Sequence, residues 1–110
     1  MRRLLLAAFI AATANPALAH QLTVFASVEC EAVTVEAKFS NGRIAKQGDV
    51  RVLDGNNNLL QTLALGSDGT ARVALNGVDH SGGLVIEVDT GSHENYWIVT
   101  PEDIGRKCGS

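Results

Sequence analysis

Apolar and polar residues alternate along much of this 110-residue chain, and the alternation limits the folds that it can adopt. Residues 22–28 carry an apolar side chain at every second position, and residues 33–39 repeat the pattern. Because successive side chains of a strand point to opposite faces, a period of two predicts strands with one buried face. After the first 19 residues, no segment of twelve or more shows the apolar period of a helix.

Five further short segments have the composition of strands, with turn signals between many of them. Asn41-Gly42, residues 54–58 and residues 67–69 are rich in Asn, Asp and Gly, which tolerate left-handed backbone. The remaining predicted strands are residues 50–52, 59–65, 71–75, 84–88 and 96–100. About seven short strands predict an all-β fold, a small antiparallel β-sandwich of transthyretin-like or immunoglobulin-like type. The inward-facing set is expected to include Val24, Val35, Val52, Val73 and Ile86.

The last ten residues depart from the strand pattern. Thr100 is a suitable N-cap and Pro101 suits the first helical position, so a helical turn is expected there. Cys108 follows, and Cys30 is the other cysteine of the chain. In an exported protein such a pair predicts a disulfide, and the alternative is a thiolate metal site. Neither cysteine has a second Cys or His within two to four residues, which favours the disulfide.

The chain begins with the pattern of a secretory signal peptide. Arg2 and Arg3 precede an apolar run over residues 4–14, and Ala17-Leu18-Ala19 supplies a small-x-small cleavage site. The apolar run of about eleven residues is too short for a bilayer, which needs roughly 20. We therefore expect residues 1–19 to be removed and residues 20–110 to form a single β-sandwich domain, periplasmic or secreted, with no transmembrane helix.

Composition narrows the classes of function. Without Arg2 and Arg3 the chain keeps seven basic and twelve acidic residues, a formal charge of −5. An acidic domain is poorly suited to nucleic acid or anionic lipid. No Gly-x-Ser-x-Gly motif or Gly-rich phosphate loop is present, so we expect no enzyme activity. Phe25 and Trp97 could stack on bases or sugars, but packing in the core or at a sheet edge is the expectation in so small a domain.

Metal binding is the chemistry that the histidines favour. Cleavage after Ala19 makes His20 the first residue, whose α-amine and imidazole can chelate one ion. His93 lies in the predicted turn before the last strand and would add a third nitrogen, with Glu94 or water supplying oxygen. His80 lies in another loop and is the weaker candidate. Imidazole and amine ligands suit Ni²⁺, Co²⁺ and Cu²⁺, and ligand softness alone does not separate these ions.

The mature start and the last strand together resemble a known family. Residues 19–26, Ala-His-Gln-Leu-Thr-Val-Phe-Ala, look like the mature start of periplasmic accessory proteins of nickel and cobalt energy-coupling-factor transporters. Residues 91–97, Gly-Ser-His-Glu-Asn-Tyr-Trp, match a second family feature, a His four residues before a Trp. The likeness also covers residues 28–31, 36–42, 50–54 and 66–69. These middle stretches are shared with many carboxypeptidase regulatory-like, transthyretin-like sandwiches.

The resemblance implies a β-sandwich that binds or hands over Ni²⁺ or Co²⁺ beside the membrane components of a metal transporter. His20 and His93 occupy the matching positions, whereas His80 does not. Cys30 stands where the family commonly has Gly, so its bridge to Cys108 would belong to this branch. Members often continue into a membrane anchor, whereas this sequence ends at Ser110, which puts membrane attachment in doubt.

Two other readings stay open at this point. A copper-carrying sandwich can also begin with a mature His, although a second His or Met cluster would be expected and the only Met is the initiator. A structural or interaction module without metal would need neither His20 nor His93. A redox enzyme built on the N-terminal His is a remote further option that nothing else in the chain supports.

Overall fold

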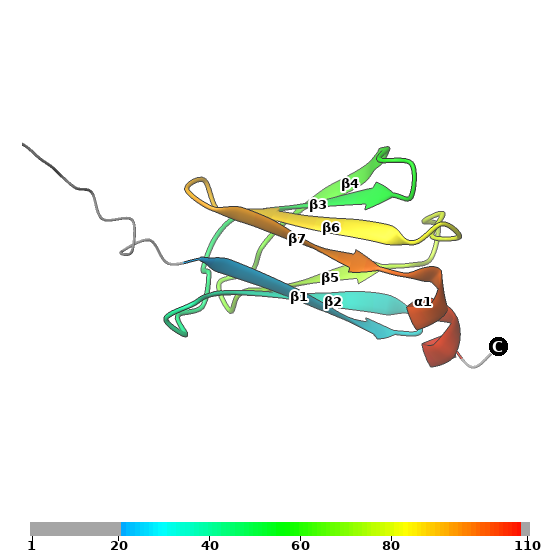
Figure 1. Ribbon diagram of the computed structural model, residues 1–110, viewed down its shortest axis with the longest axis horizontal. Helices are drawn as coiled ribbons and strands as arrows, with labels where there is room; N and C mark the ends of the chain where they lie inside the picture. The colour runs from blue at the N-terminus through cyan, green and yellow to red at the C-terminus, as the bar shows by residue number, and fades with distance from the viewer. Residues whose placement is uncertain (1–20, 109–110) are drawn as a thin grey trace, which may run out of the picture.

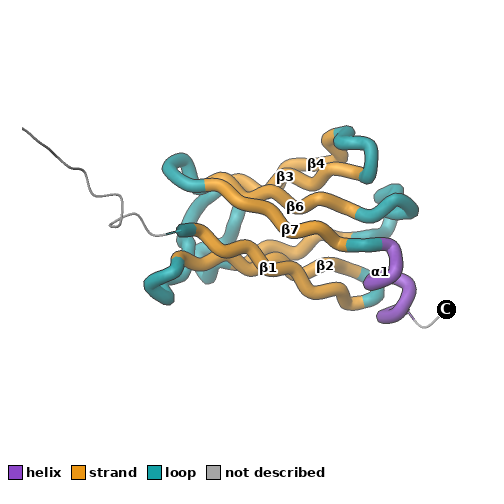
Figure 2. Tube along the Cα trace, in the orientation of Figure 1, coloured by secondary structure: helices purple, strands orange, loops and turns teal. Residues whose placement is uncertain are grey.

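The computed structural model of the protein describes residues 21–108, which form seven strands and one short helix (Figures 1 and 2). The elements are β1 (Leu22–Glu29), β2 (Ala32–Phe39), β3 (Asp49–Asp54), β4 (Leu59–Ala64), β5 (Thr70–Ala74), β6 (Leu84–Asp89), β7 (Glu94–Val99) and α1 (Pro101–Cys108). The strands make two antiparallel sheets, with orders β1-β2-β5 and β4-β3-β6-β7. The predicted small antiparallel sandwich is confirmed.

The core lies between the two sheets and is built by the alternating apolar positions. Along β1, buried and exposed residues alternate without a break. All five residues of the predicted inward set are buried, and all belong to one hydrophobic cluster. Residues 21–108 contain no buried polar or charged residue, so burial of apolar surface is what holds the sheets together.

Some strand boundaries and one connection differ from the sequence prediction. β7 begins at Glu94 rather than at Tyr96, and β3 extends to Asp49–Asp54. The tight turn at residues 67–69 does not close a hairpin, because β4 and β5 belong to different sheets. Gly69 has a φ of 80°, and a Cβ there would lie 3.0 Å from the Ala37 carbonyl oxygen. Glycine at this position therefore allows the connection between β4 and β5 to pass close to the backbone of β2.

The turn between β3 and β4 is organised by the carboxylate of Asp54. Oδ1 of Asp54 accepts hydrogen bonds from the backbone amides of Asn56, at 2.8 Å, and Asn58, at 2.9 Å. Asn57 adopts a left-handed φ of 67°, as expected for Asn in such a turn. The backbone and side-chain hydrogen bonds from Asn58, followed by the amide of Asn56, lower the pKa of Asp54 below its usual value.

The two sheets meet along one side, where edge strands β1 and β7 lie side by side (Figure 1). The Asn95 side-chain amide donates a 2.9 Å hydrogen bond to the Leu22 carbonyl oxygen. Further along, the rings of Phe25 and Trp97 pack edge to face with centroids 5.0 Å apart. Both aromatic side chains stay partly exposed, so they seal the edge of the sandwich rather than fill its core.

Helix α1 and a disulfide close one end of the sandwich (Figure 1). The helix is longer than the predicted turn because it buries Ile104 in the core. Its N-cap is as predicted, since the Thr100 hydroxyl oxygen accepts a 3.1 Å hydrogen bond from the Asp103 amide. Cys30, directly after β1, is bonded to Cys108, with their Cα atoms 4.6 Å apart. The predicted disulfide is therefore present in the structure.

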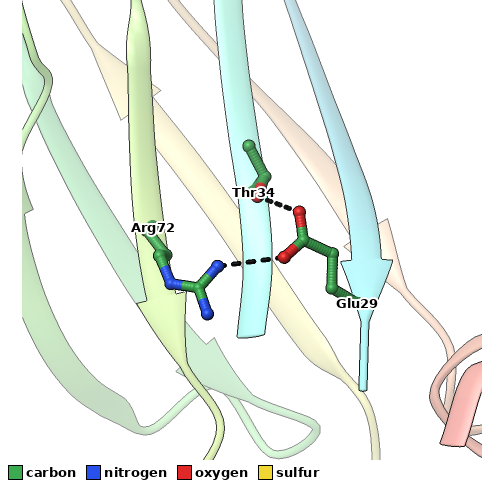
Figure 3. A network of polar contacts seen from close by, with 3 residues as sticks. All are labelled: Glu29, Thr34 and Arg72. Atoms are coloured by element: carbon green, nitrogen blue, oxygen red, sulfur yellow. Dashed lines mark hydrogen bonds and ion pairs between the residues drawn. The ribbon is translucent and has the colours of Figure 1, made fainter. Parts of the chain in front are cut away.

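A polar network joins the three strands of the smaller sheet (Figure 3). Glu29 on β1 accepts a 2.8 Å hydrogen bond from the Thr34 hydroxyl on β2 and a 2.9 Å bond from the Arg72 guanidinium on β5. These two bonds, Thr34 first, hold the pKa of Glu29 below its usual value. Arg72 is thereby engaged on the outer face of β5.

Candidate metal site

The turn that carries His93 is fixed by its own hydrogen bonds. The Thr90 amide donates to the His93 carbonyl oxygen at 2.8 Å, and the Thr90 hydroxyl oxygen accepts from the His93 amide at 3.3 Å. Between them Gly91 has a φ of 98°, and its amide donates to the Asp89 carboxylate at 2.8 Å. The turn places His93 just before β7.

The imidazole of His93 has an aromatic neighbour and a polar one. Its ring packs edge to face on Phe39, with centroids 5.5 Å apart. Its Nδ1 lies 2.9 Å from the Ser92 hydroxyl oxygen. In the tautomer whose Nδ1–H donates to Ser92, Nε2 carries a free lone pair. Metal-binding histidines commonly have this arrangement, with the second nitrogen held by a hydrogen bond.

The described chain begins in the same corner of the molecule. Gln21 and Ser40 exchange hydrogen bonds: the Ser40 amide donates to the Gln21 carbonyl oxygen at 2.8 Å, and the Gln21 amide to the Ser40 hydroxyl at 3.2 Å. The next pair in the β1–β2 ladder is Leu22 opposite Phe39, the residue that packs on His93. The start of β1 and the β6–β7 turn therefore share one end of the sandwich (Figure 1).

An open depression of about 370 Å³ lies at this corner. It is lined by Phe39, Asn41, Arg43, Ser92 and His93. The Arg43 guanidinium is exposed and contributes a positive charge that opposes cation binding at long range. Phe39, Arg43 and Ser92 were not candidates from sequence. Of these three residues, only Ser92 could have been singled out from the sequence, because it is next to His93.

The structure describes two of the three histidines, His80 and His93, and they lie at opposite ends of the sandwich. His20 lies outside the described residues, so its distance from His93 is not tested. His80 lies at the opposite end, where it lines a depression together with Cys30. Within residues 21–108, no three His, Cys, Asp or Glu side chains cluster as a metal site would require. A site at the His93 corner therefore needs ligands from outside this range.

The depression at the His80 end is the larger one, at about 750 Å³. Its lining includes Glu31 and Arg72, and the Arg72 guanidinium is already paired with Glu29. The disulfide occupies both cysteine sulfurs here, so the thiolate metal site considered from the sequence does not form in this structure. Apart from the cysteines, the metal-ligand side chains in this lining are His80 and Glu31, whereas the lining at the His93 corner contains His93 alone.

No helix among the described residues is long and apolar enough to cross a membrane. Comparisons of the chain with protein-family models, with curated proteins and with solved structures gave no match.

Proposed function

We propose that the mature protein is a periplasmic divalent-metal-binding accessory of a nickel or cobalt uptake system. The metal is its cargo, bound by the α-amine and imidazole of His20 together with the imidazole of His93. The observation that carries the proposal is the position of His93 beside the start of the described chain, with its ring on Phe39 and Phe39 opposite Leu22.

Chain connectivity supports this ligand set. Residue 20 precedes Gln21 by one peptide unit, and consecutive Cα atoms are about 3.8 Å apart. Gln21 is held to Ser40 by two hydrogen bonds, in the corner that contains His93. The proposal requires the free amine that a signal peptidase cut after Ala19 would create to reach the imidazole of His93.

Three nitrogen ligands leave coordination positions for water, for Glu94 or for a ligand from the partner that receives the metal. Such a partially open site suits transfer better than a closed structural site. The proposed partner is a membrane component of the transporter. Ni²⁺ and Co²⁺ come from the family resemblance, and Cu²⁺ is the rival ion because imidazole and amine ligands bind it more strongly in general.

Calorimetry with Ni²⁺ and Co²⁺ on mature protein that begins at His20 tests the proposal. Adding one Gly before His20 keeps both imidazoles and moves the amine out of position, so affinity should fall by at least tenfold. His93→Ala should lose a comparable amount. His80→Ala is the matched control and should bind like the native protein, because His80 lies at the other end of the sandwich.

The outcomes separate the readings. Equal affinity of the Gly-extended and native proteins would exclude the N-terminal chelate. A native protein that binds none of these ions would leave a structural or interaction module as the better reading. A free His-Gln dipeptide gives the reference preference for Cu²⁺ over Ni²⁺ and Co²⁺. A stronger preference for Cu²⁺ in the protein than in the dipeptide would instead favour the copper carrier.

A further inference from the structure

Within residues 21–108 the sandwich has four edge strands, and two of them lie side by side. β1 and β5 are the edges of the smaller sheet, and β4 and β7 those of the larger one. β1 and β7 lie side by side through Asn95 and the Phe25–Trp97 pair. β4 and β5 therefore remain as edges on the other side. An edge strand presents unpaired N–H and C=O groups that can pair with another strand.

The two remaining edges differ in how they resist such pairing. Charged side chains on an edge strand are a common protection. β5 carries Arg72, held across the outer face by Glu29. β4 has the sequence Leu-Leu-Gln-Thr-Leu-Ala, with no charge and no proline. Of the four edge strands only β4 lacks a charged residue, since β1 contains Glu29 and β7 contains Glu94.

The backbone of β4 is available for a partner in its second half. The ladder between β3 and β4 shifts register near Leu53, so the regular part opposite β3 lies at residues 61–64. The Leu65 amide donates to the Gly48 carbonyl oxygen at 2.9 Å, toward β3. Hydrogen-bonding directions alternate along an antiparallel strand, so Leu63 also faces β3, and Thr62 and Ala64 direct their N–H and C=O groups to the free edge.

An apolar row on the outer face leads to this edge. Leu59, Leu53, Val85 and Ile98 are successive partners across β4, β3, β6 and β7. Leu59 and Ile98 are 51% and 55% exposed. Leu53 is buried but is not part of the cluster between the sheets, consistent with packing on the outer face. The row ends at Leu59 on β4, the edge strand without a charged residue.

We infer that β4 pairs antiparallel with β4 of a second copy of this chain, joining two four-stranded sheets into one of eight strands. An antiparallel strand paired with itself is two-fold symmetric, which is the geometry of a closed dimer. The uncharged β4 brings no like charges together at the junction, although the acidic domains repel each other elsewhere. The apolar rows of both copies would then lie on the same face of the joined sheet, at opposite ends of the junction.

Analytical ultracentrifugation of the mature protein from about 5 to 500 µM tests this dimer, since self-association depends on concentration. The weight-average mass should approach twice that of the monomer at the upper end. Added salt should strengthen the dimer, because it screens repulsion between copies that each carry a formal charge of −5. A monomer at every concentration and salt level would overturn the inference.

Thr62 allows a matched set of variants. Thr62→Pro removes a free-edge N–H and should give a monomer, since proline is tolerated at edge positions that face solvent. Thr62→Val keeps the N–H and should still dimerise. Thr62→Lys keeps the N–H and adds a charge to the edge strand, so it too should be monomeric. This variant tests the interface if the proline variant fails to fold. A dimer that persists in every folded variant would show that β4 is not the interface.

Discussion

The Asn95 side-chain amide donates a 2.9 Å hydrogen bond to the Leu22 carbonyl oxygen, joining β7 of one sheet to β1 of the other. Leu22 follows Gln21 at the start of the described chain, and Asn95 lies two residues after His93. This bond therefore fixes the relative position of the two segments from which the proposed metal ligands come.

Asn95→Asp is expected to weaken this corner. The new carboxylate keeps the acceptor that the Tyr96 amide uses but removes the donor and places negative charge against the Leu22 carbonyl oxygen. Losing one such bond costs about 1–3 kcal/mol when a partner stays unsatisfied, measurable by urea unfolding. Asn41→Asp is the control, because its oxygen still accepts from the Arg43 amide; a loss as large in that variant would contradict the assignment.

Arg43→Gln should raise Ni²⁺ affinity if the ion binds at the His93 corner. Arg43 lines the depression there, and a unit charge about 8 Å from a divalent ion in water repels it by roughly 1 kcal/mol, or about fivefold in affinity. Arg106→Gln makes the same change in charge on α1 at the other end and should have little effect. Calorimetry at low salt would measure both, and equal affinities in the two variants would place the ion elsewhere.

Replacing both cysteines, Cys30→Ser with Cys108→Ser, should destabilise the domain strongly and leave metal affinity intact. The bridge closes a loop of 78 positions, for which the chain-entropy model gives about 4 kcal/mol. Thermal unfolding measures the loss, and thiol titration of the denatured, non-reduced native protein should find no free thiol. Two reactive thiols, or loss of metal binding in the folded variant, would contradict this expectation.

Acid should destabilise the domain through its turn aspartates. Hydrogen bonds from Asn58, Thr70 and Ser81 lower the pKa values of Asp54, Asp68 and Asp79 respectively. With the folded pKa below the unfolded value of about 3.9, each carboxylate stabilises the fold above that pH. The stabilisation is lost as pH falls through the folded pKa.

Urea unfolding between about pH 5 and pH 2 measures this loss, since stability follows the protons bound on unfolding. Asp54→Asn should flatten the profile because it removes one of the titrating groups. Asp49→Asn is the comparison variant, because it removes a carboxylate from an exposed position on β3. A profile that is unchanged by Asp54→Asn would mean that the turn does not contribute to acid sensitivity.

The candidate site was predicted only in part. His93 was proposed from its turn and from the likeness at residues 91–97, and the structure shows hydrogen bonds within that turn and between the ring and Ser92. Phe39 and Arg43 lie fifty or more residues before His93 and had no signal as site residues. Contacts between distant segments depend on which strands pair, and a period of two does not specify partners.

Local features of the fold were determined by the sequence itself. Alternation places Val24 and Ile86 in the core because side-chain direction reverses at each residue of a strand. The Asp54 turn and the Thr100 cap also follow from local hydrogen bonding. Tertiary structure decided the rest. It separated β4 from β5 despite the tight turn between them, and it extended α1 to bury Ile104. It also brought β7 beside β1, because two sheets must bury their apolar faces against each other and only the complete set of strands defines how they meet.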